Sequence, residues 1–283
     1  MNHKGFTLVE LLVVIAVIAV LMAILLPVLG RVRKQAKSVV CRAHLKQWGR
    51  VFALYTEEHE GCFQRNGDNG LDCALSLLRG IHIGNDVDPN TSGRYHSVRT
   101  EGIALCPMAT RGSGPGTFGG TSGSTGRVWL KGVYGLNFSP WEITEPQPMF
   151  RMSYGLNDKV FSPFFESPHP SEIYASDLHV FSLRARDTIP LLFDCVAPSS
   201  SLGSERSPPP KEEPSGASGG LIINRHQGCM NGLFFDWSVR SIGLKELWTL
   251  KWRLYWNTAG PWTKAGNVQP EDWPKWMQGF KDY

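Results

Sequence analysis

With 283 residues, of which 42% are apolar and 19% charged, the chain has the composition of a folded protein and not of a disordered one. Its formal net charge of +4 is small, and its basic residues gather behind the first apolar segment instead of forming a stripe, so we expect no nucleic-acid partner. The length allows one domain or two.

The first feature along the chain is an apolar segment of membrane-spanning length. It runs from Phe6 to Leu26, and Glu10 is the only charged residue in it. As a helix, these 21 residues would extend about 31 Å, enough to cross the hydrocarbon core of a bilayer. The small residue Gly5 precedes the apolar run, whereas an ordinary secretory signal has its cleavage site after it. Cleavage after Gly5 would therefore leave the whole membrane segment on the mature protein.

Glu10 needs a partner, because an ionisable side chain near the membrane core costs about 2.5–3.5 kcal/mol. After cleavage, the new amine of Phe6 would lie one helical turn from Glu10 in the same chain. The same amine would also be able to neutralise Glu10 of a neighbouring helix and set the stagger between them. The alternative is that Glu10 lies near the membrane surface and reaches water.

The segment Gly5-Phe6-Thr7-Leu8-Val9-Glu10, followed by a long apolar stretch, resembles the N-terminal signal of type IV prepilins and type II secretion pseudopilins. The resemblance implies that a prepilin peptidase cuts after Gly5 and methylates the amine of Phe6. It also implies that Glu10 helps to dock the subunit into a growing filament. Pro27, at the end of the apolar run, matches a kink position common in that family.

The orientation in the membrane follows from the resemblance and conflicts with the distribution of charge. Only Lys4 precedes the span, whereas several basic residues follow it: Arg31, Arg33, Lys34, Lys37 and Arg42. The positive-inside rule alone would place the body in the cytosol. The resemblance implies a single-pass inner-membrane protein with a cytoplasmic N-terminus and a periplasmic or extracellular main domain. It implies as partners the prepilin peptidase, other pilin-like subunits, membrane lipid and an inner-membrane assembly platform.

Behind Pro27, apolar residues recur at spacings of three and four: Val32, Ala36, Val39, Val40, Ala43, Trp48, Val51, Phe52 and Tyr55. This periodicity predicts a helix that lies on the sheet of its own domain. We divide the chain into a leader (1–5), a transmembrane and filament-core helix (6–27), an amphipathic continuation (28–57), a body (58–243) and a tryptophan-rich C-terminal helix and tail (244–283).

The body is predicted to be α+β, with an antiparallel sheet packed against the long helix, as in pilins. A short helix is expected near 71–78, and surface loops at 110–126 and 197–220. Strands are expected at 128–130, 150–156, 179–183, 188–193, 221–224, 232–235 and 238–242.

His226 and Asp236, with nine residues between them, resemble the H-X9-DG segment of pilin-like proteins abundant in Planctomycetes, Verrucomicrobia and Lentisphaerae. The segments 153–157 and 41–47 also resemble parts of those proteins. Trp237 stands where that pattern has glycine, so we expect a wider hairpin here. We predict that His226 donates a hydrogen bond to Asp236 and stabilises the hairpin.

A metal or acid–base site that joins His226 and Asp236 to Asp194 or His179 is the alternative. However, the sequence contains no HExxH, GxSxG, phosphate-loop or Cys–His nucleophile pattern, and no EF-hand spacing. We therefore assign no catalytic residue, cofactor or metal ligand from the sequence, and predict that the protein is not an enzyme.

The six cysteines are Cys41, Cys62, Cys73, Cys106, Cys195 and Cys229. None forms a CxxC pair, which argues against a zinc ribbon or a thioredoxin-like site. An even number fits disulfides in a domain outside the cytosol, and buried thiols are the alternative. The pairing stays open, because six cysteines allow about 15 arrangements.

Trp248, Trp252 and Trp256 are spaced four apart, which predicts that they share one side of a C-terminal helix. We favour packing of that side against the sheet over a platform for sugar rings or a partner protein. The later tryptophans are expected at an exposed surface: Trp262, Trp273 and Trp276.

The leading functional hypothesis is a structural subunit of a type IV pilus-like or type II secretion pseudopilus filament. The second is a membrane-anchored module that binds polysaccharide or a secreted substrate through its tryptophan-rich end. The third is a membrane-anchored hydrolase that uses His226 and Asp236.

Overall fold

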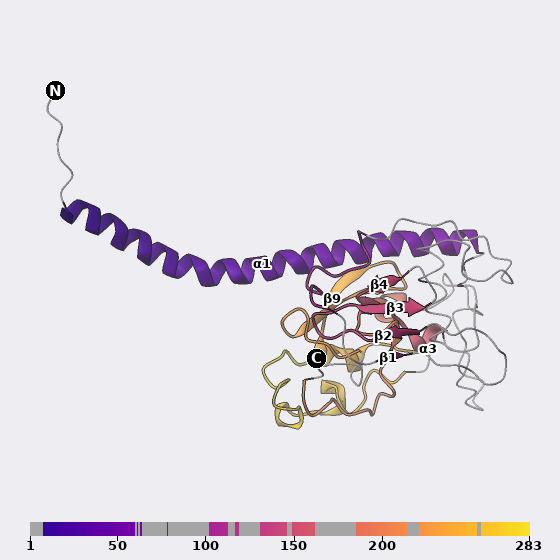
Figure 1. The fold of residues 1–283 in the computed structure, drawn as a ribbon. Helices are drawn as coiled ribbons and strands as arrows, with labels where there is room; N and C mark the ends of the chain where they lie inside the picture. The colour runs from indigo at the N-terminus through magenta and orange to yellow at the C-terminus, as the bar shows by residue number, and fades with distance from the viewer. Residues whose placement is uncertain are drawn as a thin grey trace.

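A long helix, α1 (Leu8–Glu58), leads into a body made of two β-sheets (Figure 1). The computed structural model describes residues 8–59, 61, 63, 78, 102–112, 117–118, 131–145, 149–161, 185–213, 221–253 and 256–283. The first half of α1 projects from the body as a rod, and its second half lies along the body (Figure 1). This is the α+β architecture that the sequence predicts.

Helix α1 is continuous through Pro27. Proline lacks an amide hydrogen and its ring crowds the preceding turn, so a proline inside a helix bends it. The ribbon accordingly changes direction before it reaches the body (Figure 1).

The second half of α1 buries one stripe of side chains against the body. Its buried residues recur every three or four positions: Cys41, Leu45, Trp48, Gly49, Phe52, Tyr55 and Thr56. The predicted stripe is correct for Trp48, Phe52 and Tyr55. It is wrong at Val39 and Val40, which are 55% and 44% exposed although the neighbouring residue Ser38 already contacts Asn231 of the body. The early contacts with the body are made by the side chains of Ser38 and Cys41, so apolar periodicity alone does not reveal where contact starts.

The strands form a four-stranded and a five-stranded sheet. The first has the order β1-β2-β3-β4 with antiparallel neighbours: Thr117–Phe118, Lys131–Val133, Trp141–Glu145 and Phe150–Met152. The second has the order β7-β5-β6-β8-β9: Ser199–Ser200, Tyr154–Asn157, Pro190–Asp194, Cys229–Phe234 and Val239–Gly243. Its neighbours are antiparallel except for the parallel pair β5 and β7. Only Ser153 separates β4 from β5, so the chain passes directly from one sheet to the other.

Strand β8 shows how the five-stranded sheet is covered on both faces, because side chains alternate along a strand. Leu233 belongs to the core cluster under α1, and the side-chain Nδ2 of Asn231 donates to Ser38 Oγ of that helix. Met230 and Phe234 belong to the second cluster, beneath the C-terminal segment. Helix α1 therefore covers one face of the sheet, and residues after 243 cover the other.

The turn between β8 and β9 is compact, although a wider hairpin was expected. The amide of Trp237 donates to the carbonyl of Phe234, and the amide of Phe234 donates to the carbonyl of Ser238, as in a three-residue loop with a bulge. Trp237 takes the left-handed conformation (φ 65°) that glycine usually supplies. The turn tolerates this residue because the Trp237 side chain packs against the core under α1. Asp236 accepts a hydrogen bond from the Ser238 amide at 2.9 Å, which further holds the turn.

The strand predictions succeed where a run is apolar and bounded by turns. The runs at 188–193, 232–235 and 238–242 correspond to β6, β8 and β9, and 150–156 corresponds to β4 and β5. The run at 221–224 is not a strand, and short strands occupy both predicted loops. The predicted strands at 128–130 and 179–183, and nearly all of the helix at 71–78, lie outside the described residues.

The predicted C-terminal α-helix is not formed. The segment contains three short 3₁₀ turns: Leu244–Thr249, Lys264–Gly266 and Pro270–Asp272. Leu250 is extended, and the next amide, that of Lys251, donates to the carbonyl of Thr188. A tertiary hydrogen bond thus takes the amide that a longer helix would have used.

The packing of α1 can be tested at Trp48, which is fully buried and donates from Nε1 to the Ile103 carbonyl at 3.0 Å. We expect Trp48→Ala to lower the free energy of unfolding by about 3–5 kcal/mol, because it opens a large cavity. Leu54→Ala, on the same helix but 61% exposed, should change it by less than about 0.5 kcal/mol. Chemical unfolding of the detergent-solubilised full chain, followed by circular dichroism, measures both. Equal effects of the two substitutions would show that this half of α1 does not pack on the body.

Candidate functional site

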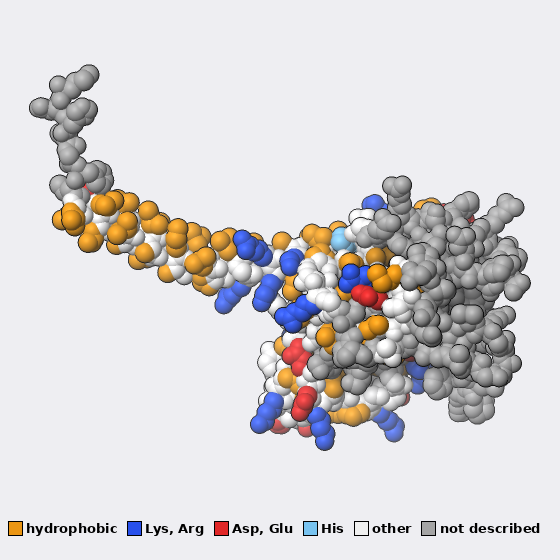
Figure 2. All heavy atoms as spheres, in the orientation of Figure 1, with side chains coloured by type: hydrophobic (Ala, Val, Ile, Leu, Met, Phe, Trp, Pro, Cys, Tyr) orange, Lys and Arg blue, Asp and Glu red, His pale blue; other side chains and the backbone are white. Residues whose placement is uncertain are grey.

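The projecting half of α1 is apolar on all sides. Five consecutive residues, from Leu11 to Ile15, are each exposed by 53–58% except Val14, at 46%. Figure 2 shows this rod as a nearly continuous apolar surface that extends away from the body. A helix that is apolar all round belongs inside a protein core or a membrane.

Water is excluded as the working environment of this rod. Between Leu8 and Val32, 18 large apolar side chains are exposed. Burying one such side chain is worth about 1.5–3 kcal/mol, so the whole rod would gain on the order of 30 kcal/mol by leaving water. Among the described residues, α1 is the helix long and apolar enough to cross a membrane. The rod must therefore lie in lipid or against other apolar helices.

Of the residues predicted to act at this end of the chain, Gly5 and Phe6 lie outside the described residues. Glu10 lies in the first turn of α1, among the exposed apolar residues of the rod. Its position near a helix N-terminus is favourable for a carboxylate, because the helix dipole is positive there.

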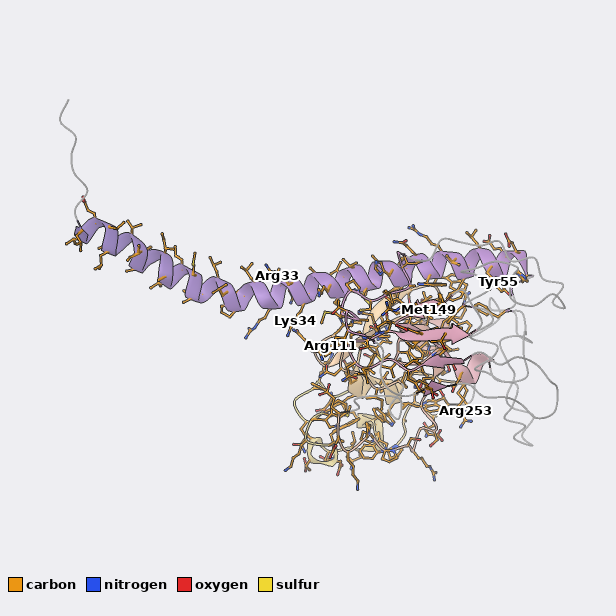
Figure 3. All side chains as sticks on the ribbon, viewed as in Figure 1. Arg33, Lys34, Tyr55, Arg111, Met149 and Arg253 are labelled. Atoms are coloured by element: carbon orange, nitrogen blue, oxygen red, sulfur yellow. The ribbon has the colours of Figure 1, made fainter. Side chains whose placement is uncertain are left out.

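Basic side chains mark the junction between the rod and the body. Arg33 and Lys34 project from α1 where it reaches the body (Figure 3), and Figure 2 shows basic side chains gathered at this place. Arg31, Arg33, Lys34 and Lys37 are all exposed. The helix thus changes within two turns from an apolar surface to a cationic one.

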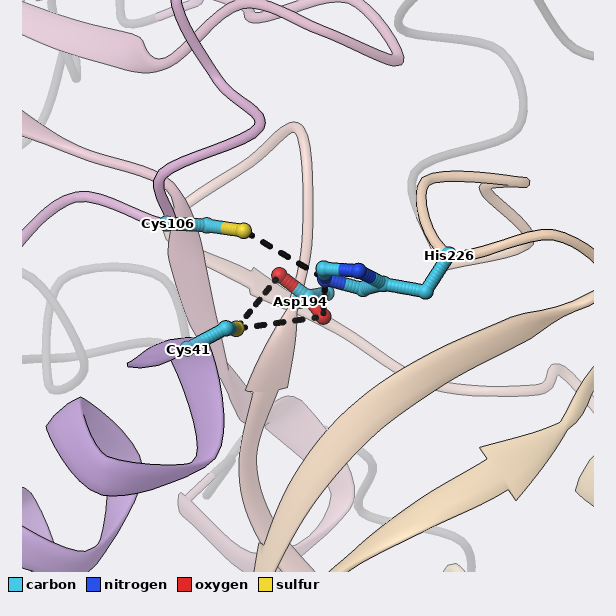
Figure 4. Close-up of side chains that lie close together, drawn as sticks. All are labelled: Cys41, Cys106, Asp194 and His226. Atoms are coloured by element: carbon cyan, nitrogen blue, oxygen red, sulfur yellow. Dashed lines mark hydrogen bonds and ion pairs between the residues drawn. The ribbon is translucent and has the colours of Figure 1, made fainter. Parts of the chain in front are cut away.

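A second site is buried between α1 and the sheet, where four polar side chains meet (Figure 4). Cys41 comes from α1, Cys106 from the segment before β1, Asp194 from the end of β6, and His226 from the turn before β8. Their ligand atoms all lie within 4.8 Å of one another. All four side chains are almost completely shielded from solvent, the most exposed residue being His226 at 9%.

The sequence-based prediction that His226 pairs with Asp236 is therefore wrong. Its Nε2 lies 3.2 Å from Asp194 Oδ2 and 3.3 Å from Cys106 Sγ, whereas Asp236 holds the hairpin turn. His226 precedes β8 and Asp236 follows it, and β8 is an extended strand, which separates the two. The alternative that joined His226 and Asp236 to Asp194 is correct for His226 and Asp194 and wrong for Asp236; His179 lies outside the described residues.

The electrostatics of this cluster favour negative charge on Asp194 and Cys106 and positive charge on His226. Burial alone would raise the pKa of Asp194, but the hydrogen bond and charge of His226 and the charge of Arg225 lower it to about 2. Burial also opposes ionisation of Cys106, yet hydrogen bonds with Cys41 and His226 lower its pKa to about 6. Burial would lower the pKa of His226, and the hydrogen bonds with Asp194 and Cys106 raise it to about 9. Burial and contact with Cys106 raise the pKa of Cys41 well above its usual value.

Arg225, a fully buried cation, lies beside the cluster and pairs with Asp194. Its Nη1 lies 3.0 Å from Asp194 Oδ1 and 2.8 Å from the Ser153 carbonyl. Its Nε donates to the Asn137 carbonyl at 2.7 Å, and its Nη2 reaches the Cys195 carbonyl at 3.4 Å. A buried charge of this kind is tolerated only when it is paired and hydrogen-bonded, and both conditions are met.

Comparison with known proteins assigns the projecting helix. Residues 1–26 match the family described as the prokaryotic N-terminal methylation motif. Over 152 residues, the chain is 57% identical to the type IV wide pilus major component PilA4 of Thermus thermophilus. The matched region is 52% of this chain and 95% of PilA4.

The chain belongs to the type IV pilin family. No solved structure matches it. Pilins are structural proteins, so the predicted role as a pilus subunit is confirmed, and the exposed rod is the membrane-anchoring helix of a pilin. The assignments to a type II secretion pseudopilus and to the H-X9-DG proteins stay predictions. About half of this pilin lies outside its similarity to PilA4.

The tryptophan-rich end of the pilin is built into the body, which does not favour the binding-module hypothesis. Trp248 and Trp252 are completely buried, and Trp256 is 5% exposed. Packing against the sheet is therefore correct for these three, even though they do not share a helix. Trp273 was expected at the surface and is 3% exposed, because it packs edge-on against Trp248. Trp262 and Trp276 are half-buried.

The meeting of Cys41 and Cys106 in the cluster was not predicted from the sequence. The four described cysteines are free thiols, and Cys62 and Cys73 lie outside the described residues. The sequence did indicate separate pieces, since segments 41–47 and 153–157 and His226 carry one common resemblance. No spacing rule brings these pieces together, because 153 positions separate Cys41 from Asp194.

The buried ion pair predicts a large difference between two arginines. Arg225→Met should lower the free energy of unfolding by about 3–5 kcal/mol, because it leaves the charge of Asp194 buried without its partner. Arg240→Met removes a pair with Glu246 in which the arginine side chain is 39% exposed, so it should change stability by about 0–1 kcal/mol. Unfolding midpoints of the two variants, measured side by side, check this. A loss at Arg225 no larger than at Arg240 would contradict the buried ion pair.

Proposed function

We propose that this pilin is matured by a prepilin peptidase, waits in the inner membrane, and then enters a type IV pilus-like filament through its α1 rod. The observation that carries the proposal is the rod itself, which is apolar on every side and continuous with the half of α1 that packs on the body. An anchor that only holds a protein in a membrane has no need of a continuous helix that extends into the body. A subunit that packs by this helix does, because the helix then positions the body on the filament.

In the membrane stage, the N-terminus lies in the cytoplasm and the body in the periplasm or outside the cell. The basic residues at the base of the rod do not oppose this orientation, because the positive-inside rule applies to short loops and long domains translocate largely regardless of charge. Exposed cations such as Arg33 and Lys34 suit the level of phosphate headgroups, where they also meet water.

Maturation removes residues 1–5 by cleavage after Gly5 and methylates the new amine of Phe6. The support is the match of residues 1–26 to the N-terminal methylation motif. Cleavage creates a cation at the tip of an apolar rod, at the same end as Glu10. The two charges are then available for each other at matching depth.

In the filament, Glu10 of one subunit neutralises the Phe6 amine of its neighbour. A carboxylate among apolar side chains costs about 2.5–3.5 kcal/mol on membrane-insertion scales, and pairing it with a cation recovers that cost. The pairing requires a fixed axial offset between adjacent rods, because both charges occupy defined turns of their helices. The same interaction therefore selects subunits and sets their stagger.

A catalytic role has little support. In a nucleophile–histidine–carboxylate triad, the two partners contact different nitrogens of the imidazole. Here Cys106 and Asp194 both face Nε2 of His226. The cluster is also closed to solvent, so a substrate would have no access to it. We therefore propose a purely structural protein.

Maturation is tested by intact-mass and N-terminal analysis of the protein from its native membrane. The expected mature chain begins at N-methylated Phe6. Gly5→Leu should leave the leader attached, because the peptidase no longer finds a small residue at the cleavage site, whereas Asn2→Ala should be processed normally. A wild-type chain that retains Met1 would overturn this proposal.

The role of Glu10 is tested by Glu10→Leu, which preserves the apolar character of the rod and removes its charge. We expect at least a tenfold loss of sheared filaments by immunoblot, with undiminished subunit in the membrane fraction. Glu58→Leu changes an exposed carboxylate at the opposite end of the same helix, and it should assemble as the wild type does. Normal assembly of Glu10→Leu would exclude a docking role for the carboxylate.

A further inference from the structure

We propose that Cys41, Cys106, Asp194 and His226 bind one zinc ion in a closed structural site that ties α1 to the body. The site is separate from the apolar rod, and neither the pilin family nor the proposed assembly mechanism requires it. The cluster offers two sulfurs, one imidazole nitrogen and one carboxylate oxygen, each from a different segment of the chain (Figure 4).

Three of the six distances between the ligand atoms are close to the edges of a tetrahedron around zinc, and all six are within 4.8 Å. With Zn–S near 2.3 Å and Zn–N and Zn–O near 2.0–2.1 Å, those edges are about 3.5 Å for S–N and S–O, and about 3.3 Å for N–O. Cys106 Sγ lies 3.3 Å from His226 Nε2, and Cys41 Sγ lies 3.7 and 3.8 Å from the two oxygens of Asp194. His226 Nε2 lies 3.2 Å from Asp194 Oδ2. The side chains thus need to move by only a few tenths of an ångström along these three edges.

Hydrogen bonding alone accounts poorly for this arrangement. His226 directs one nitrogen, Nε2, at both Cys106 and Asp194, and that nitrogen carries at most one proton. One proton cannot make good hydrogen bonds in two directions. A cation placed among the four atoms interacts with all of them through lone pairs, and Nε2 then acts as a ligand in the neutral imidazole.

The charges balance with a divalent ion. Two thiolates and the carboxylate of Asp194 supply three negative charges, zinc supplies two positive charges, and buried Arg225 supplies the third. This neutral set is suited to a site without solvent, where unbalanced charge is costly. The mixed sulfur and nitrogen donors favour zinc over calcium or magnesium, which prefer oxygen.

A second set of contacts already holds the ligands in place. The Tyr154 hydroxyl lies 3.3 Å from Cys41 Sγ, and the Asn231 amide donates to Asp194 Oδ2 at 2.8 Å. The Cys106 amide donates to Ser153 Oγ at 2.6 Å, which fixes the segment that carries this cysteine. Such outer contacts are typical of metal sites, because they orient ligands and tune their basicity.

Burial of all four residues indicates a structural ion and not a catalytic one, which would keep a coordination position open to solvent. With the body outside the cytosol, as proposed above, a bound zinc ion would also protect the two neighbouring thiols from oxidation. A disulfide between Cys41 and Cys106 is the competing outcome, and the experiment separates the two.

The test uses the full chain, purified in detergent from its native membrane without chelators or reductant. We expect about one zinc per chain by mass spectrometry of the metals, and free thiols at Cys41 and Cys106 in a non-reducing peptide map. Cys106→Ala should retain less than a tenth of that zinc. Cys195→Ala, which removes another completely buried thiol of the body, should retain all of it. Less than a tenth of an equivalent in the wild type, or a Cys41–Cys106 disulfide, would overturn the proposal.

A substitution that keeps a ligand guards against misfolding as the cause of metal loss. His226→Cys should bind zinc, because it replaces nitrogen by sulfur, whereas His226→Ala should not. Cobalt added in place of zinc should give thiolate charge-transfer absorption and tetrahedral d–d bands in the wild type and in Cys195→Ala. Absence of these bands from a folded wild type, or their presence in Cys106→Ala at wild-type intensity, would contradict a site made of these four residues.

Discussion

One uninterrupted helix has to satisfy two environments that exclude each other, and the other parts of this pilin are arranged around that requirement. The rod is apolar on every side, whereas from Cys41 onward the same helix packs one face on the protein's own sheet. An α-helix is a stiff connection, so any contact that fixes its second half also fixes the direction in which the rod leaves the body. The burial of Trp48 and Phe52 in the core under α1 therefore also fixes the direction of the distant, projecting end of the helix.

The contact between helix and sheet is not uniformly apolar. Near the point where α1 reaches the body, its Cys41 contacts Asp194, which forms a charged pair with Arg225 without access to solvent. Buried polar groups of this kind add little net stability, but they tolerate few alternative arrangements, because each displaced partner leaves an uncompensated charge. Apolar packing would allow α1 to slide along the sheet by a turn, whereas the polar cluster does not. The stability of the interface thus comes mainly from the aromatic residues, and its register comes from the cluster.

The sequence was sufficient for features that depend on local pattern. The apolar run, the motif around Glu10 and the strands β6, β8 and β9 were all predicted, because each depends only on residues that are close together in the sequence. The C-terminal helix was predicted wrongly, since the Lys251 amide finds a distant carbonyl that no local pattern reveals. The cluster of Cys41 with His226 was missed for the same reason. Each of four separate segments contributes one side chain to the cluster, and these side chains become neighbours only when α1 packs on the sheet.

The apolar surface of the rod, which is open on every side of the helix, also bears on the free energy of moving a subunit from the membrane into a filament. Lipid tails and leucine side chains are similarly apolar, so moving the rod from a bilayer into a bundle of like rods changes its free energy little. The balance between the two locations then rests on small terms, such as one charge pair and the contacts between bodies. For a rod of this kind, leaving the bilayer and returning to it therefore both cost little free energy.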